Sequence, residues 1–166
     1  MAILADKSVV HPPLEVLVTV DEETGMYGAF ALEGGLLQGK TLLNLDSEAE
    51  GELYVGCAGG VDTTAKFAYT PVEVEEGDVA IKVSLTGCKG GHSGCDIHLQ
   101  RANANKLLFR FLKEAVANYE ARLACVEGGS LRNAIPREAS AIITVPAEGV
   151  DDIMDLVAEC EDLFVA

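Results

Sequence analysis

Basic residues are scarce in this chain. Lys and Arg total 12 against 27 Asp and Glu, which gives 166 residues a formal net charge of −15. Nucleic acids and anionic membrane surfaces bind proteins through patches rich in Lys and Arg. We therefore expect no nucleic acid and no membrane among its partners.

Long apolar runs are also missing. None approaches the roughly 18 residues that a membrane-spanning helix needs, and residues 1–6 lack the basic stretch and long apolar segment of a secretory signal. The five cysteines are an odd number without the spacing of a disulfide framework, which indicates reduced thiols. Since 49% of the residues are apolar, the chain can build a core, and we expect a folded cytoplasmic protein.

The first sixty residues contain three short apolar runs, at 14–20, 41–45 and 52–58. Short, nearly continuous apolar runs are typical of strands buried on both faces of a parallel sheet. The first two runs end in acidic residues and the third ends in a glycine pair. This pattern predicts that residues 1–60 are part of a parallel α/β domain.

After Gly60 the pattern changes to alternating polar and apolar residues, which indicates antiparallel strands with one solvated face. Apolar residues at helical spacing follow in two segments. The predicted order is that of an α+β, ferredoxin-like (β-α-β-β-α) domain over residues 61–166. The predicted strands are 61–74, 79–86, 121–127 and 139–145, and the predicted helices are 99–120 and 150–164.

Acidic residues follow the first two predicted strands. Asp21, Glu22 and Glu23 come directly after the first, and Asp46 follows the second. Open α/β sheets place their ligand sites at these strand ends. One carboxylate could bind a metal ion there while its neighbour accepts a proton from a metal-bound water. The alternative is that these acids are solvated turns or helix caps.

A glycine-rich loop is predicted at 87–94, and four residues of types that bind zinc lie in it and just after it, between 88 and 98. Their spacing, C-x3-H-x2-C-x2-H, is not among the usual structural zinc sites, which favours incidental thiols and unrelated histidines. Glycines on both sides of the first histidine predict a closely bent loop that presents its ring at the tip. The four residues are Cys88, His92, Cys95 and His98.

A second loop, at 133–138, begins with Asn133 and contains Pro136 and Arg137. Asn followed closely by Pro marks a shaped turn between strands. The Asn133 amide and the Arg137 guanidinium could hold a substrate carbonyl or carboxylate. The alternative is an ordinary turn with a surface arginine.

Four motifs, taken together in their order and spacing, closely resemble the aminoacyl-histidine dipeptidases. These are cytosolic Xaa-His dipeptidases, also called peptidase D or carnosinase-like, of the M20 metallopeptidase family. The resemblance implies a catalytic domain with two zinc ions and a lid domain that closes over substrate and supports homodimerisation. It extends along the whole chain and is carried by residues 19–26, 44–48, 89–94 and 131–139.

The resemblance implies a role for five residues. Glu22 is similar to the general base that activates the metal-bound water, Glu23 to a ligand of one zinc, and Asp46 to a ligand of the other. In the lid, His92 resembles the histidine that stabilises the substrate carbonyl, and Asn133 the asparagine that contacts substrate. The family's lid arginine would fall near Pro146, so Arg137 is a substrate-binding candidate from its local pattern alone.

The family's other zinc ligands are not matched. An upstream His-x-Asp motif, the bridging Asp after it and a His near the C-terminus have no counterpart, so only Glu23 and Asp46 of five ligands are present. We therefore expect an internal segment, with its lid incomplete at the C-terminus, and little activity from this chain alone. The alternative is a non-catalytic binding or oligomerisation module that self-associates through an edge strand or helix of the lid.

Overall fold

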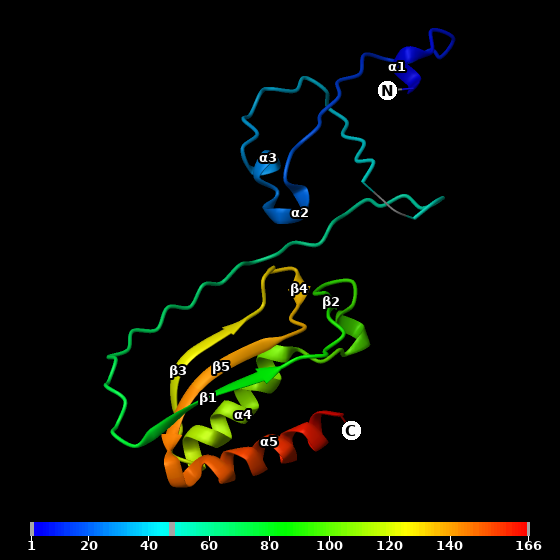
Figure 1. Cartoon of the computed structure of the whole chain (residues 1–166). Helices are drawn as coiled ribbons and strands as arrows, with labels where there is room; N and C mark the ends of the chain where they lie inside the picture. Colours follow the sequence, from blue (N-terminus) through cyan, green and yellow to red (C-terminus); the bar gives the residue numbers. More distant parts are fainter. Residues whose placement is uncertain (1, 47–48, 166) are drawn as a thin grey trace. The chain divides into compact units, whose positions relative to one another are not determined.

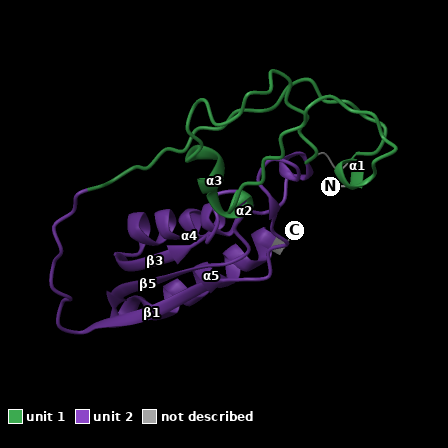
Figure 2. Ribbon diagram, turned by 90° about the horizontal axis from the view of Figure 1, so that it is seen from above, with its two compact units in different colours: residues 1–67 green, residues 68–166 purple. Residues whose placement is uncertain are grey.

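The computed structural model describes residues 2–46 and 49–165. The chain divides into two compact units, coloured separately in Figure 2. We call residues 1–67 the amino-terminal unit and residues 68–166 the carboxyl-terminal unit. Each is described by itself.

The carboxyl-terminal unit is built on an antiparallel sheet with strand order β1-β5-β3, seen in Figure 1. Helices α4 and α5 supply the side chains that cover one face of it. This β-α-β-β-α order confirms the predicted mixed α/β fold with a small antiparallel sheet. Its elements are β1 (Asp78–Leu85), α4 (Ala104–Asn118), β3 (Arg122–Gly128), β5 (Ala139–Pro146) and α5 (Val150–Val165).

Strand β5 lies in the middle of the sheet and alternates between two environments. Ala141, Ile143 and Val145 are buried, and Ile143 pairs with Ile81 of β1 and with Leu123 of β3. Side chains of a strand point alternately to opposite faces, so this set forms the floor of the core. The intervening Ile142 is half exposed on the other face.

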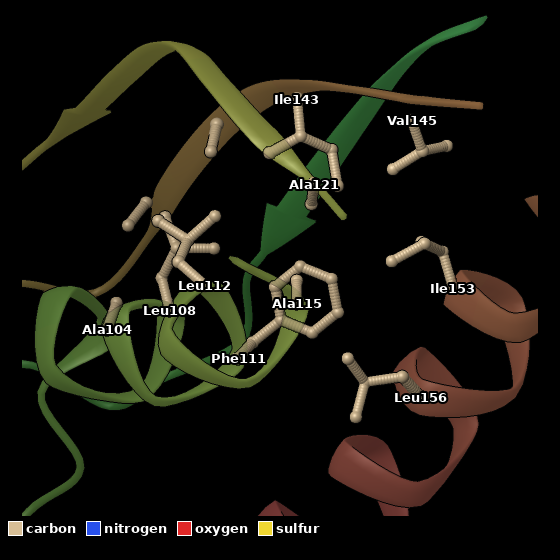
Figure 3. Packing of buried hydrophobic residues seen from close by; sticks show 12 residues of the cluster. Ala104, Leu108, Phe111, Leu112, Ala115, Ala121, Ile143, Val145, Ile153 and Leu156 are labelled. Carbon is tan, nitrogen blue, oxygen red and sulfur yellow. The ribbon is translucent and has the colours of Figure 1, made fainter. Parts of the chain in front are cut away.

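The two helices complete the core, which Figure 3 shows from close by. Helix α4 begins where the Asn103 side chain accepts a hydrogen bond from the Lys106 N–H (3.1 Å), an N-cap arrangement. Its apolar residues recur every three or four positions and therefore lie on one face. The buried helix residues are Ala104, Leu108, Phe111, Leu112 and Ala115 of α4 with Ile153 and Leu156 of α5.

A second, two-stranded sheet pairs β2 (Gly91–His92) with β4 (Ala134–Ile135). We call it the β2–β4 ribbon. A single 3₁₀ turn, η1 (Ile97–Leu99), follows β2, and another, η2 (Ala147–Gly149), precedes α5. The ribbon was not predicted, because two-residue strands leave no alternation to detect.

The amino-terminal unit contains three short helices: α1 (Ala2–Ala5), α2 (Glu22–Gly25) and α3 (Tyr27–Phe30). Its described residues form no strand, so the parallel sheet predicted from 14–20, 41–45 and 52–58 is wrong for this chain. A strand needs a neighbour for its N–H and C=O groups, and none of these runs forms a β-ladder with any of the described residues. Their side chains stay in solvent, as Leu45 (90% exposed) and Val55 (96%) illustrate.

Two further predictions need correction. The strand predicted at 61–74 is absent from the structure, for the same lack of a paired neighbour. The helix predicted from residue 99 begins at Ala104, because the preceding 3₁₀ turn ends at Gln100 in a left-handed conformation (φ 51°) that interrupts helical geometry. The strand predicted at 79–86 and the strands and helix after Ala121 match the structure to within one residue at each end.

Candidate functional site

The β2–β4 ribbon brings His92 and Asn133 together. His92 pairs with Ala134 across the ribbon, and the Ser93 N–H donates to the Asn133 carbonyl oxygen at 2.8 Å. Two segments about forty residues apart in sequence are thus joined by backbone hydrogen bonds. His92 is exposed and Asn133 is half buried, so both lie where a small molecule can reach them.

Arg137 lies at the same end of the carboxyl-terminal unit. Its carbonyl oxygen accepts the Cys88 N–H (3.2 Å), and its side chain runs beside Gly90, where a Cβ atom would overlap it. The carbonyl oxygen of Pro136 accepts the Ala104 N–H (3.1 Å), which ties this loop to the start of α4. The structure therefore gathers the three predicted substrate-binding residues on two adjoining loops.

The His92 ring is held by its own loop. Its Nδ1 atom lies 3.0 Å from the Gly94 N–H nitrogen and 3.0 Å from the Cys95 N–H nitrogen. A backbone amide can only donate, so Nδ1 is the acceptor and carries a lone pair. In the neutral ring the proton then sits on Nε2, which leaves Nε2–H as a donor for another molecule.

Two residues that sequence analysis did not single out support this loop. The Asp96 carboxylate accepts the His92 N–H at 2.8 Å, and the Arg101 guanidinium forms an ion pair with that carboxylate at 3.1 Å. One feature of the sequence points to these residues. The Gly90-Gly91 pair indicates that other groups pack closely against the backbone there, but it does not identify them as Asp96 and Arg101.

An open hollow of about 550 Å³ lies on the sheet face opposite the helices, bordered by Arg137. Lys82, Ser84 and Ser140 face it from β1 and β5, and Glu127 from β3. The residues that border the hollow include both charges and several hydroxyl groups.

The zinc site considered for residues 88–98 gains no support. Within residues 2–46 and 49–165, no group of three His, Cys, Asp or Glu side chains could hold a metal ion. The Nδ1 atom of His92 is already engaged by two amides. Cys88 and Cys95 are free thiols.

The predicted catalytic and metal-binding acids lie in the amino-terminal unit. Glu22 and Glu23 occupy the first turn of α2 after Asp21, whose backbone is left-handed (φ 56°), and both side chains are exposed. Asp46 is also exposed, and its N–H donates to the Asn44 side chain at 3.0 Å. Residues 47–48, which complete the predicted motif around Asp46, lie outside the described residues.

The residues present do not fit a complete zinc centre. A catalytic zinc commonly has three protein ligands, and two exposed carboxylates offer fewer. The described part of the chain gathers no third ligand beside Glu23 or Asp46. The assignment of these two residues as zinc ligands stays a prediction.

Comparison with known families bears on the carboxyl-terminal unit directly. The model of the M20 peptidase dimerisation domain matches residues 83–166, about half of the chain. The chain belongs to this family. The matched region covers the last three residues of β1 and everything after it, including the β2–β4 ribbon and the loops of His92, Asn133 and Arg137.

Two relatives extend the likeness to nearly the whole chain. The cytosol non-specific dipeptidase of Escherichia coli K12 is 51% identical over 164 residues, which are 99% of this chain and 34% of that protein. The crystal structure of aminoacylhistidine dipeptidase from Vibrio alginolyticus matches with a TM-score of 0.65 at 48% identity, over 98% of this chain and 33% of that one. The predicted resemblance to M20 dipeptidases is confirmed. The chain spans about a third of the length of either relative.

No helix among the described residues is long and apolar enough to cross a membrane.

Proposed function

We propose that this chain forms part of a cytoplasmic M20 dipeptidase that hydrolyses Xaa-His dipeptides, and that its carboxyl-terminal unit is the lid that binds substrate. One observation carries the proposal: the β2–β4 ribbon joins His92 to Asn133 through the 2.8 Å bond from Ser93 to Asn133. The two dipeptidase relatives, each aligned over at least 98% of this chain, support a dipeptide substrate, and the aminoacylhistidine dipeptidase among them supports the Xaa-His class.

Three side chains of the lid have distinct roles in this proposal. The Nε2–H of His92 donates to the carbonyl oxygen of the scissile peptide bond and stabilises the negative charge that grows there during attack. The Asn133 amide hydrogen-bonds the substrate backbone. The Arg137 guanidinium pairs with the substrate carboxylate, a geometry in which two parallel hydrogen bonds can form.

Glu22 is the proposed general base. Its carboxylate removes a proton from the attacking water as the water oxygen bonds to the carbonyl carbon, and it later delivers that proton to the amine as the C–N bond breaks. Glu23 and Asp46 are proposed as two of the ligands for a zinc pair. Because these residues do not complete a zinc site, the chain alone should hydrolyse dipeptides very slowly.

A graft into the E. coli relative tests the proposal. This chain would replace the aligned third of that enzyme, and hydrolysis of a β-alanyl- or glycyl-histidine dipeptide would be measured together with the elution volume and circular dichroism of the graft. We expect a folded graft to retain activity within about tenfold. A folded graft without activity would contradict the proposal. Rapid hydrolysis by the isolated chain would contradict the part of the proposal that makes activity depend on zinc ligands beyond Glu23 and Asp46.

The match to a dimerisation domain supports a second candidate, a non-catalytic association module. The two candidates make different predictions for His92→Ala. A pure association module keeps its function in that variant, whereas the dipeptidase graft loses activity.

A further inference from the structure

The loop that carries His92 is closed by Asp96 from two directions. The Asp96 N–H donates to the His92 carbonyl oxygen at 3.0 Å, and the Asp96 carboxylate accepts the His92 N–H at 2.8 Å. Both backbone polar groups of His92 are therefore bonded to one residue. The turn between them holds Gly94 and Cys95, whose N–H groups point at the imidazole.

Arg101 fixes the carboxylate in turn. The same guanidinium nitrogen donates to the Asp96 carboxylate (3.1 Å) and to the Gly90 carbonyl oxygen (2.8 Å). Both side chains of the pair are largely shielded from solvent, with exposures of 22% for Arg101 and 29% for Asp96. Shielding weakens the screening that makes surface ion pairs ineffective. The pair thus links the residues before His92 to those after it.

Gly91 lies between these parts and shows how tightly they are packed. Its backbone has φ 150°, and a Cβ atom placed there would overlap the Arg101 guanidinium and the Asp96 carboxylate. The ion pair therefore lies directly against the backbone of the residue that precedes His92.

We infer that Asp96 and Arg101 are positioning residues that lock His92 in the tautomer with its proton on Nε2. The carboxylate shapes the turn, the turn aims two N–H groups at Nδ1, and the only donor left on the neutral ring is Nε2–H. This inference rests on the proposed function for its purpose, because a donor at Nε2 is what a substrate carbonyl requires. The lock itself is independent of any activity.

Nitrogen-15 spectra of the whole chain test the lock. The chain has three histidines, so long-range proton–nitrogen correlations resolve each ring. The spectra are recorded in alkaline buffer so that neutral rings are compared. His92 should show the Nε2–H tautomer alone, with a hydrogen-bonded Nδ1. The Gly94 and Cys95 amides should exchange slowly. His11 provides an internal contrast, because its Nδ1 lies 2.7 Å from the Pro12 carbonyl oxygen and must donate.

Asp96→Ala should release the ring. We expect the nitrogen chemical shifts of the His92 ring to move to those of a blocked free histidine, and the Gly94 and Cys95 amides to exchange at least tenfold faster. The amide signals of β1 and β5 should stay in place. Asp96→Asn keeps an oxygen acceptor and should restore most of the wild-type spectrum. Asp151→Ala removes an exposed carboxylate of α5 and should change neither ring signal nor loop exchange. A wild-type His92 with the mixed tautomers of free histidine, or an Asp96→Ala variant with an unchanged ring, would overturn the inference.

Kinetics of the graft separate this inference from the proposed function. With the lock present, Asp96→Ala should lower kcat by up to about a hundredfold with a smaller change in KM, since a misplaced donor weakens the transition state more than the bound substrate. An equal loss in Asp96→Asn and Asp96→Ala would contradict positioning through the acceptor oxygen. If the graft is inactive while His92 of the isolated chain shows the Nε2–H tautomer alone, the proposed function is rejected and the lock is established.

Discussion

Gly91 has no side chain, and two charged groups occupy the space where one would stand. Gly91→Ala should push the Asp96 and Arg101 side chains away and strain a backbone with φ 150°. Strain of this kind costs on the order of 1–3 kcal/mol. We expect faster amide exchange in residues 92–96 and a lower urea midpoint.

Gly149→Ala is the matched control, because nothing lies within 4 Å of a Cβ atom at that position. It should leave both measurements nearly unchanged. Equal loop exchange in Gly91→Ala and in the wild type would show that the ion pair does not rest against this backbone.

At the residue scale, the sequence predicts those site residues that have a distinctive local pattern. His92 stood out because glycines flank it, and Asn133 because a proline follows closely. Asp96 and Arg101 were missed because an acid and a base five positions apart on a charged surface have no distinctive pattern. Their importance comes from the Gly90 carbonyl and the His92 N–H that they reach in the fold.

At the scale of elements, helices α4 and α5 owe their stability to a shared apolar face. Leu108→Ala removes a side chain that is 1% exposed and should lower the free energy of unfolding by about 2–5 kcal/mol. Leu163→Ala makes the same change in α5 at a position that is 70% exposed, and it should cost less than about 0.5 kcal/mol. Urea denaturation of both variants measures the difference, and similar losses would contradict the assigned core.

Helix α5 also carries a thiol with altered acidity. Partial burial raises the pKa of Cys160, and the nearby carboxylates of Glu159 and Glu114 raise it further. A smaller thiolate fraction slows alkylation, so at pH 8 Cys160 should react with iodoacetamide severalfold more slowly than the exposed Cys57 and Cys95. Peptide mass spectrometry follows each rate, and a Cys160 that reacts first would refute the prediction.

The same shift sets a direction for stability against pH. Because the folded-state pKa of Cys160 lies above its unfolded value, its contribution to stability is complete below the ordinary thiol pKa. That contribution falls as the pH rises through the folded-state value.

Elements could be predicted from the sequence where their signal is local. The three- and four-residue spacing of Leu108, Phe111 and Leu112 defines α4 without knowledge of any neighbour, and the alternation from Ile81 to Leu85 in β1 indicates a strand with one solvated face. The apolar runs at 14–20 and 52–58 have equal strand character. They fail because strand formation depends on a hydrogen-bonded partner.

At the scale of the whole molecule, the match to a dimerisation domain predicts that two copies associate through the carboxyl-terminal unit. Strands β1 and β3 are the edges of its sheet, and unpaired edges are sites of pairing between chains. Sedimentation velocity across a range of concentrations should show a monomer–dimer equilibrium. A single monomeric species at the highest concentration would contradict this prediction.

In the proposed function, His92 is the substrate-facing hydrogen-bond donor of a dipeptidase lid. Turnover of the His92→Ala variant of the E. coli graft tests this role most directly. We predict a fall in kcat of about 10²–10³ fold, the usual loss when one donor to a developing oxyanion is removed. His98→Ala, in the adjoining η1 turn, should keep the turnover of the unmodified graft. A His92→Ala graft that hydrolyses the dipeptide as fast as the His98→Ala graft would contradict the account.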